Sequence, residues 1–469
     1  MFFQKPLGNN SDDSDGENPQ SSNASSSGPS LTNLGIAPDE RAGLLGREVT
    51  LLSAVMLNIG QITGSGIYAV PGAILSSVGS IGILLVFWVV APIFASGGLT
   101  LYAEYASLFP HRSGGEVVFL EQAYPHPRFL VSVSYAATII LTSFNASNAI
   151  VFAQYFLSAF QVTITPQKQT LVALAVSFAT AATVALSTKW SLRAVNFLTS
   201  VKIIVLIFMV FTGFAVLGGF THIDNPYANF KNPFEGSSFN GNALSTGYLK
   251  ANHAFIGWAN AFNVIGEVRS KNPARTVRKA GIISLVLVSI LFLFINIAYI
   301  AVVPRDIIGK SGQLVAVLFF QRVFGSAGAK AFPLLVALSC FGNIQARIVR
   351  EVARQGLLPY PSFFSSIKPF GTPLGPVALR TTFTALVILA IPAKDAFNFI
   401  IDLTSYPNLV FQCALAAGIW VIRARRRSLG FPPAPLRAKS IVITLYLIFC
   451  ILLLVLPWYA PCLFVVLFC

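Results

Sequence analysis

The chain has 469 residues, of which 55% are hydrophobic and only 10% are charged. Soluble domains carry about 25% charged residues. A chain of this length with so few charges could not cover a water-facing surface. The net charge of +15 would suit a nucleic-acid partner, but the basic residues lie in short connections between apolar segments, which is typical of membrane topology. Composition therefore predicts an integral membrane protein that does not bind nucleic acid.

Residues 1–45 differ from the rest, because they are rich in Asn, Ser, Gly and Asp. They lack the basic start and apolar core of a signal peptide. Their composition predicts a disordered cytosolic tail. Two roles stay open for it: a regulatory tail modified at Lys5 or at its serines, and an inert tail.

Apolar segments of the length that crosses a bilayer core as a helix follow from residue 50 onward. The alternation of barrel strands is absent, so the expected fold class is all-α. We expect a ten-span core over 46–425, and a final span with a short apolar stub over 426–469. The eleven spans are expected near 50–77, 81–108, 130–158, 169–187, 195–219, 248–267, 281–303, 331–351, 376–392, 396–422 and 440–458.

The basic residues predict the orientation of the spans. Lys and Arg concentrate in the connections that face the cytosol if the amino terminus is cytosolic, which agrees with the positive-inside rule. The run from Arg423 to Arg427 is best interpreted as a topology anchor, in contact with lipid headgroups but not a specific lipid site.

Spans 1 and 6 are unusual because helix-weakening and polar residues interrupt them. Span 1 carries Gly60, Thr63–Gly66 and then Pro71, while span 6 carries His253 and Gly257 among several asparagines. Each is the first span of a five-span block. Because each block has an odd number of spans, the second block must cross the membrane in the orientation opposite to the first. Paired interrupted helices in inverted repeats indicate a transporter site.

The chemistry of such a site follows from the interruption. Unwinding leaves free N–H groups at the start of one half-helix, which attract a carboxylate, and free carbonyls at the end of another, which attract an ammonium. One pocket then suits a zwitterionic α-amino acid, and Gly64 and Gly66 let it approach the backbone. Close helix packing by small residues is the alternative for a single glycine pair.

Several motifs together resemble the amino acid–polyamine–organocation superfamily over about residues 47–425. Within it, the stretch from Asn260 to Val268 is similar to the fungal L-type amino acid transporters, especially the methionine permeases. The motifs that carry the resemblance are Thr63–Ile67 with Pro71-Gly72, Pro110–Glu116, Phe255–Trp258, Gly266–Val268, Asn272–Thr276 and Arg347–Pro359.

The resemblance implies an inverted five-plus-five transmembrane helix repeat that works by alternating access. It implies that N–H groups at Ser65, Gly66 and Ile67 bind the substrate carboxylate, and that backbone oxygens near Ile62, Ala254 and Phe255 bind its ammonium. Asn145 and Asn148, three apart in span 3, are expected on one helix face toward the pocket, with polar contact between helices as the alternative. The full candidate set is Ile62, Thr63, Gly64, Ser65, Gly66, Ile67, Asn145, Asn148, His253, Ala254, Phe255, Ile256 and Gly257.

Two titratable residues carry open alternatives. His253 lies where many relatives have an aromatic gate; it either gates or titrates, or it is a buried neutral histidine with a backbone partner. Lys202 lies in span 5 where, in some sodium-independent relatives, a lysine fills the place of a sodium ion. It is either the proton carrier of the coupled step, or it snorkels to the cytosolic interface.

Two departures from the superfamily bear on activity. Span 8 has room for only a fragment of a crossing between Phe332 and Ile344, a loss on the order of 9 Å of helix. The chain also stops before a twelfth span. Both predict that a shortened or transport-defective version of the fold is one possible outcome.

The sequence thus predicts a proton-coupled transporter of neutral L-amino acids, with methionine as the leading substrate, in the plasma membrane and without a cofactor. The alternative is a receptor that binds an amino acid without moving it. A multi-span enzyme is disfavoured, since no metal-site spacing or nucleophile motif is present.

Overall fold

The computed structural model describes residues 49–110, 112–127, 130–142, 145–186, 188–343, 374–391 and 396–458. Within these residues the chain is helical, apart from loops and one isolated backbone bridge between Val49 and Val268. Seven of the described helices are long and apolar enough to cross a membrane. The expected all-α membrane class is confirmed. The predicted tail, the motif from Arg347 to Pro359 and the carboxyl-terminal stub lie outside the described residues.

We assign the described helices to the eleven expected spans, several of which are divided. Span 1 consists of α1 (Leu51–Ile62) and α2 (Gly66–Val78), and span 6 of α9 (Gly241–Ala254) and the 3-10 helix η4 (Asn260–Glu267). The other spans are α3 (Ile81–Leu108), α5 (Leu130–Thr142) with α6 (Ala146–Ala159), α7 (Pro166–Leu186), α8 (Thr188–Leu217), α10 (Pro273–Val302), α12 (Val315–Asn343), α15 (Leu374–Ala390), α16 (Ala396–Ser428) and α17 (Ser440–Val455).

Short helices lie in the connections between these spans. They are α4 (Glu116–Ala123), η3 (Ala228–Phe230) and α11 (Arg305–Lys310), and η5 (Leu456–Trp458) follows α17.

Three of the differences from the expected spans are informative. Helix α10 begins at Pro273 because a proline is favoured in the first turn of a helix, where its missing N–H costs nothing. Span 3 is not one helix, since Asn145 lies outside both α5 and α6 with φ −99° and ψ 27°. Helix α12 begins well before residue 331, with a kink at Gly325 whose φ of 65° suits glycine. The predicted shortening of span 8 concerns residues beyond Asn343, outside the described part.

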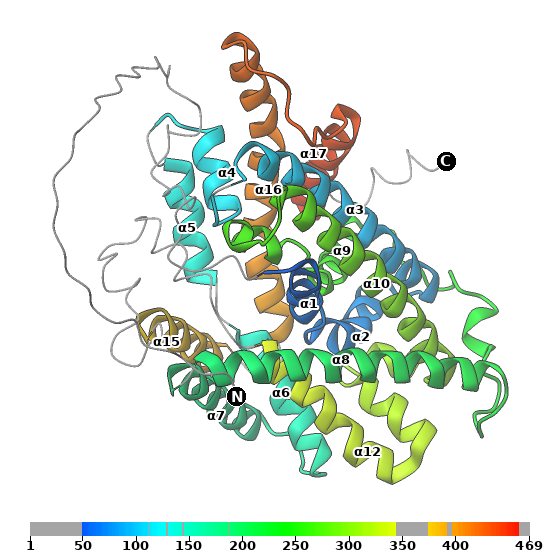
Figure 1. Cartoon of the computed structure of the whole chain (residues 1–469). Coiled ribbons are helices and arrows are strands. Elements are labelled where there is room, and N and C mark those ends of the chain that lie inside the picture. Colours follow the sequence, from blue (N-terminus) through cyan, green and yellow to red (C-terminus); the bar gives the residue numbers. More distant parts are fainter. Residues whose placement is uncertain are drawn as a thin grey trace, which may run out of the picture. The chain divides into compact units, whose positions relative to one another are not determined.

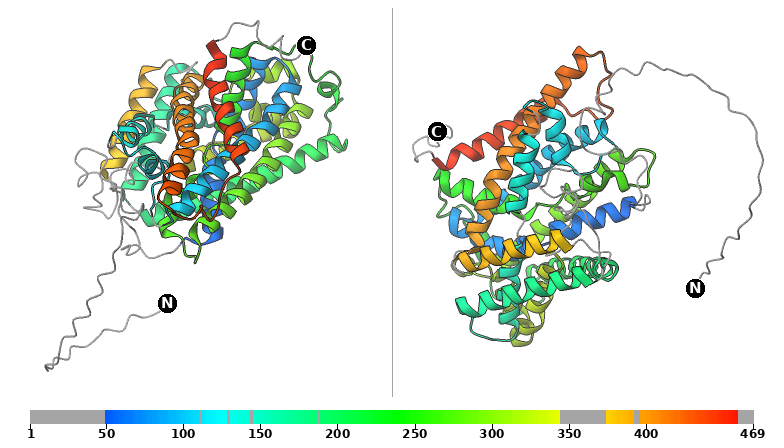
Figure 2. Two further views of the ribbon diagram at one scale, coloured as in Figure 1. Left: turned by 90° about the horizontal axis from the view of Figure 1, so that it is seen from above. Right: turned by 90° about the vertical axis from the view of Figure 1, so that its left-hand side faces the viewer.

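The two halves of span 1 lie at the centre of the bundle (Figure 1). Helix α2 packs against α9, and α1 packs against α10 and α8. Helix α12 packs against α6 and α8, while α7 lies against α15. Figure 2 shows α17 (red) beside α16 (orange) in both turned views. The interrupted spans are therefore enclosed by other helices.

Aromatic side chains support the helices around the interruptions. The buried Trp88 ring of α3 lies 5.8 Å from the Phe255 ring and 5.7 Å from the Phe292 ring, measured between centroids. Such pairs add about 0.5–1.5 kcal/mol beyond their burial. They anchor the end of α9 to α3 and α10, so the unwound segment starts from a fixed point.

A buried ion pair joins three spans near one end of the bundle. The Glu104 carboxylate of α3 accepts hydrogen bonds from Arg423 Nε at 2.8 Å and Nη2 at 2.6 Å, and from the Ala438 N–H at 2.8 Å. The carboxylate is fully enclosed and the Arg423 side chain is 14% exposed. This contact ties α3 to the end of α16 and to the segment that leads into α17.

We expect Glu104→Gln to lower the stability of the folded protein by about 3 kcal/mol, because it leaves the enclosed guanidinium without its charge partner. The melting temperature of the purified protein in detergent measures this change. Glu235→Gln is the matched control, since Glu235 is exposed. Equal melting temperatures for the two variants would contradict the assigned role of Glu104.

Candidate substrate site

The interruption of span 1 lies between Ile62 and Gly66. The Thr63 hydroxyl donates to the Ile59 carbonyl at 2.7 Å, and Thr63 itself has φ −77° and ψ 66°, which is not helical. Helix α2 then starts afresh at Gly66. Among the described residues, the N–H groups of Gly66 and Ile67 have no hydrogen-bond acceptor. The start of α2 therefore offers two free donors at a helix amino terminus, which is a favourable place for an anion.

The interruption of span 6 follows Ala254, the last residue of α9. Gly257 has φ 124°, and a Cβ at this position would lie 2.9 Å from the backbone nitrogen of Ile62. Only glycine fits there, so its place next to span 1 explains why this residue type is needed. The carbonyl groups of Ala254 and Phe255 accept no hydrogen bond within the described part of the chain. The end of α9 thus presents free acceptors.

The two interruptions meet. A Cβ on Gly66 would lie 2.7 Å from the Cα of Ala254 and 2.8 Å from its Cβ, so the two backbones are in direct contact. The free N–H groups of α2 and the free carbonyls of α9 therefore lie at one junction, which we call the Gly66–Ala254 junction. Donors for a carboxylate and acceptors for an ammonium come together there, as an α-amino acid requires.

Two of the expected backbone contacts already have partners inside the protein. The Ser65 N–H donates to Asn148 Oδ1 at 3.2 Å, and the Ile62 carbonyl accepts the Gly64 N–H at 2.8 Å. The Asn148 side chain therefore occupies the donor that was expected to bind the substrate carboxylate. A carbonyl has two lone pairs, so Ile62 retains one for a further donor.

Asn145 and Asn148 both approach the span 1 interruption, although Asn145 precedes α6 and does not share its helical face. Asn145 Nδ2 donates to the Asn343 carbonyl at 3.2 Å, and Asn343 Nδ2 donates to the Gln61 carbonyl at 3.2 Å. A Cβ on Gly64 would overlap the Asn343 amide and lie 3.4 Å from Asn148 Oδ1. Asn343 is thus part of the site, although the sequence indicated it only as a polar residue in an apolar span.

Lys202 of α8 points into the protein. Its side chain is 3% exposed, and Nζ donates to the Gly60 carbonyl at 3.2 Å and to Asn343 Oδ1. Among the described residues no carboxylate pairs with this ammonium. The snorkelling alternative requires the opposite direction, toward the membrane surface, so the geometry disagrees with it. The lysine instead links the end of α1 to the end of α12.

The remaining candidates in span 6 have distinct environments. His253 follows Lys250 on α9, and its Nδ1 is enclosed without a hydrogen-bond partner in the described residues. The backbone partner expected for a buried neutral histidine is therefore not found at Nδ1. Ile256 is 41% exposed, so its side chain does not pack into the core. Gly257 acts through its backbone conformation.

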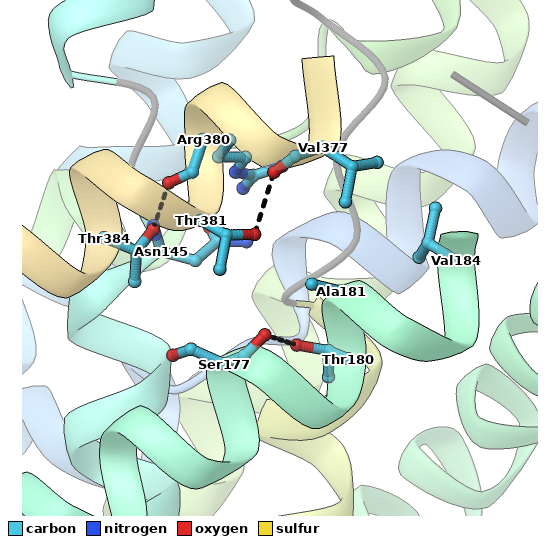
Figure 3. Close-up of a pocket in the computed structure, with 9 residues that line it drawn as sticks. All are labelled: Asn145, Ser177, Thr180, Ala181, Val184, Val377, Arg380, Thr381 and Thr384. Carbon is cyan, nitrogen blue, oxygen red and sulfur yellow. Dashed lines mark hydrogen bonds between the residues drawn. The ribbon is translucent and has the colours of Figure 1, made fainter. Parts of the chain in front are cut away.

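A small cavity, separate from the Gly66–Ala254 junction, lies between α7 and α15, beside Asn145 (Figure 3). Its volume of about 20 Å³ is close to that needed for one water molecule. The Asn145 N–H donates to Thr384 Oγ1 at 3.2 Å, and Arg380 Nε is enclosed without a partner in the described chain. Arg380 lies within the span expected at 376–392 and was not among the predicted site residues. The residues that line this cavity are Asn145, Ser177, Thr180, Ala181, Val184, Val377, Arg380, Thr381 and Thr384.

In the described residues, a helical bundle in which two interrupted helices touch, with free N–H groups and free carbonyls at the contact, is typical of membrane transporters. The amino acid permease family matches residues 49–466 of the chain. The chain therefore belongs to the amino acid permease family, and it is an integral membrane protein that transports amino acids.

Several characterised proteins resemble the chain over most of its length. The high-affinity methionine permease of Saccharomyces cerevisiae is 33% identical over 426 residues, which cover 88% of this chain and 73% of that protein. The low-affinity methionine permease of the same yeast is 29% identical over 399 residues, covering 82% and 71%. The large neutral amino acids transporter small subunit 2 of mouse is 28% identical over 432 residues, covering 89% and 77%.

Proposed function

We propose that the chain is a proton-coupled transporter of neutral L-amino acids, with methionine as its leading substrate, which works by alternating access. The observation that carries this proposal is the Gly66–Ala254 junction, where free N–H groups of α2 and free carbonyls of α9 suit the two charges of an amino acid. The names of the yeast relatives support methionine, and that of the mouse relative supports large neutral side chains.

The proposed proton carrier is Lys202. Its ammonium bonds to the Gly60 carbonyl of α1 and to Asn343 of α12, so a change in its protonation alters the contact between span 1 and span 8. Deprotonation would remove the positive charge and one of the three N–H donors, which weakens the hydrogen bonds to both acceptors and loosens α1. The protonation of Lys202 is thereby linked physically to the movement of span 1.

The proposed location is the plasma membrane, with the amino terminus in the cytosol. The Arg425–Arg427 run lies at the end of α16, the end that faces the cytosol in this orientation. Spans 1 and 6 then cross in opposite directions.

Uptake of labelled L-methionine by cells that lack their own methionine permeases tests the proposal. We expect saturable uptake without sodium, faster at acidic than at neutral external pH, and competed by other neutral amino acids. Cells with an empty vector and surface labelling of the protein are the controls. Saturable binding without accumulation, from a chain present in the membrane, would favour the receptor alternative instead.

A further inference from the structure

A buried lysine lies one helical turn from the Gly66–Ala254 junction. Lys250 on α9 is 5% exposed, and its Nζ donates to the Ala73 carbonyl at 3.3 Å and to Ser77 Oγ at 3.0 Å on α2. Neither acceptor carries a charge. A buried ammonium is costly in a membrane unless an anion compensates it, so a carboxylate is to be expected nearby.

Asp402 on α16 supplies that carboxylate. Helix α16 packs against α9, and Asp402 and Lys250 interact electrostatically. Its Oδ1 atom is enclosed but accepts no hydrogen bond from the described residues. Among the described residues neither an ion pair nor a hydrogen bond joins the two groups, so each charge retains capacity for a further polar partner.

The pair lies to one side of the junction. Lys250 precedes Ala254 by four residues, about 6 Å along α9, and its acceptor Ala73 follows Gly66 by seven residues, about 10 Å along α2. Lys250 therefore lies toward the start of α9, and Ala73 lies toward the end of α2. Lys250 thus lies between the junction and the face of the bundle where α2 ends and α9 begins.

We propose that Lys250 and Asp402 form a charge-balanced subsite that selects amino acids without net charge. The inference rests on the proposed function and adds the residues that determine charge selectivity. The ammonium meets the carboxylate of an arriving zwitterion, and the Asp402 carboxylate meets its ammonium. Because the pair has no net charge, an amino acid with an extra charge gains nothing that offsets its loss of hydration.

Removing one charge should change which amino acids pass. Lys250→Met leaves Asp402 uncompensated, so the ratio of lysine to methionine uptake should rise by about tenfold. Asp402→Asn leaves Lys250 uncompensated, so the ratio of glutamate to methionine uptake should rise by a similar factor. The double variant restores balance and should again prefer methionine. Lys310→Met and Asp306→Asn on the exposed surface of α11 are the matched controls.

The measurement is uptake of labelled methionine, lysine and glutamate by each variant, normalised to protein at the cell surface. Unchanged selectivity in both single variants would overturn the inference. If a single variant fails to reach the membrane, the exchanged variant Lys250→Asp with Asp402→Lys is used, and loss of its preference for methionine would overturn the inference equally. Failure of the unaltered protein to move any amino acid would instead count against the proposed function.

Discussion

Gly66→Ala is expected to abolish amino acid uptake while the protein still reaches the membrane. The new Cβ would lie 2.7 Å from Ala254 Cα and 2.8 Å from Ala254 Cβ, closer than carbon atoms pack. Neither neighbour can rotate away, because one is backbone and the other is fixed to it. The interrupted ends of α2 and α9 must therefore separate, which moves the free N–H groups away from the free carbonyls.

The loss in methionine uptake should be at least about tenfold, since displacement of a binding group by about 1 Å costs up to 100-fold in well-ordered sites. Gly309→Ala is the matched control, because a Cβ on Gly309 of α11 has open space around it. Uptake by both variants is compared at equal surface levels. Normal uptake by Gly66→Ala would mean that the Gly66–Ala254 junction is not the substrate site.

Lys202→Met should lower methionine uptake about tenfold and remove its stimulation by acidic external pH. The methionine side chain has similar length but no donor, so the Gly60 carbonyl and Asn343 Oδ1 each lose their partner. An unsatisfied buried acceptor costs about 1–3 kcal/mol. The residual uptake should be independent of pH, because the proposed proton carrier is gone.

Lys202→Arg separates the two roles of this lysine. Arginine keeps donors but does not release its proton at physiological pH, so uptake that remains should show no acid stimulation. Lys279→Met, at an exposed position of α10, controls for the loss of a positive charge. Initial uptake rates across external pH are the measurement, and acid stimulation that persists in both Lys202 variants would exclude this residue as the proton carrier.

Much of the fold could be predicted because its causes are local in sequence. Glycines and polar residues interrupt spans 1 and 6 at Gly64–Gly66 and at Gly257, and the odd number of spans in each five-span block inverts the second interruption relative to the first. The structure has both interruptions where the sequence predicted them. The expected start at residue 331 misses the first part of α12, because its apolar turns from Val315 to Phe320 are followed by Gln321 and Arg322 and are separated from the rest by the break at Gly325.

The side-chain contacts of the site could not be predicted because they depend on how helices face one another. Hydropathy placed Asn148 and Asn343 inside spans, but not the contact of Asn148 with the Ser65 N–H or of Asn343 with Lys202. Lys202 lies near the start of an apolar stretch, so an inward and an outward direction were equally compatible with its position. Arg380 lies within the expected span 376–392 and was assigned no role there, yet it lines a cavity.

Accumulation of L-methionine by the purified protein in sodium-free lipid vesicles tests the central claim most directly. With acidic buffer outside and neutral buffer inside, labelled methionine should rise above its external concentration, and a protonophore should release the excess. Vesicles containing the Gly66→Ala variant should show no accumulation. Methionine that binds to the unaltered protein, but never exceeds its external concentration under the imposed gradient, would contradict proton-coupled transport.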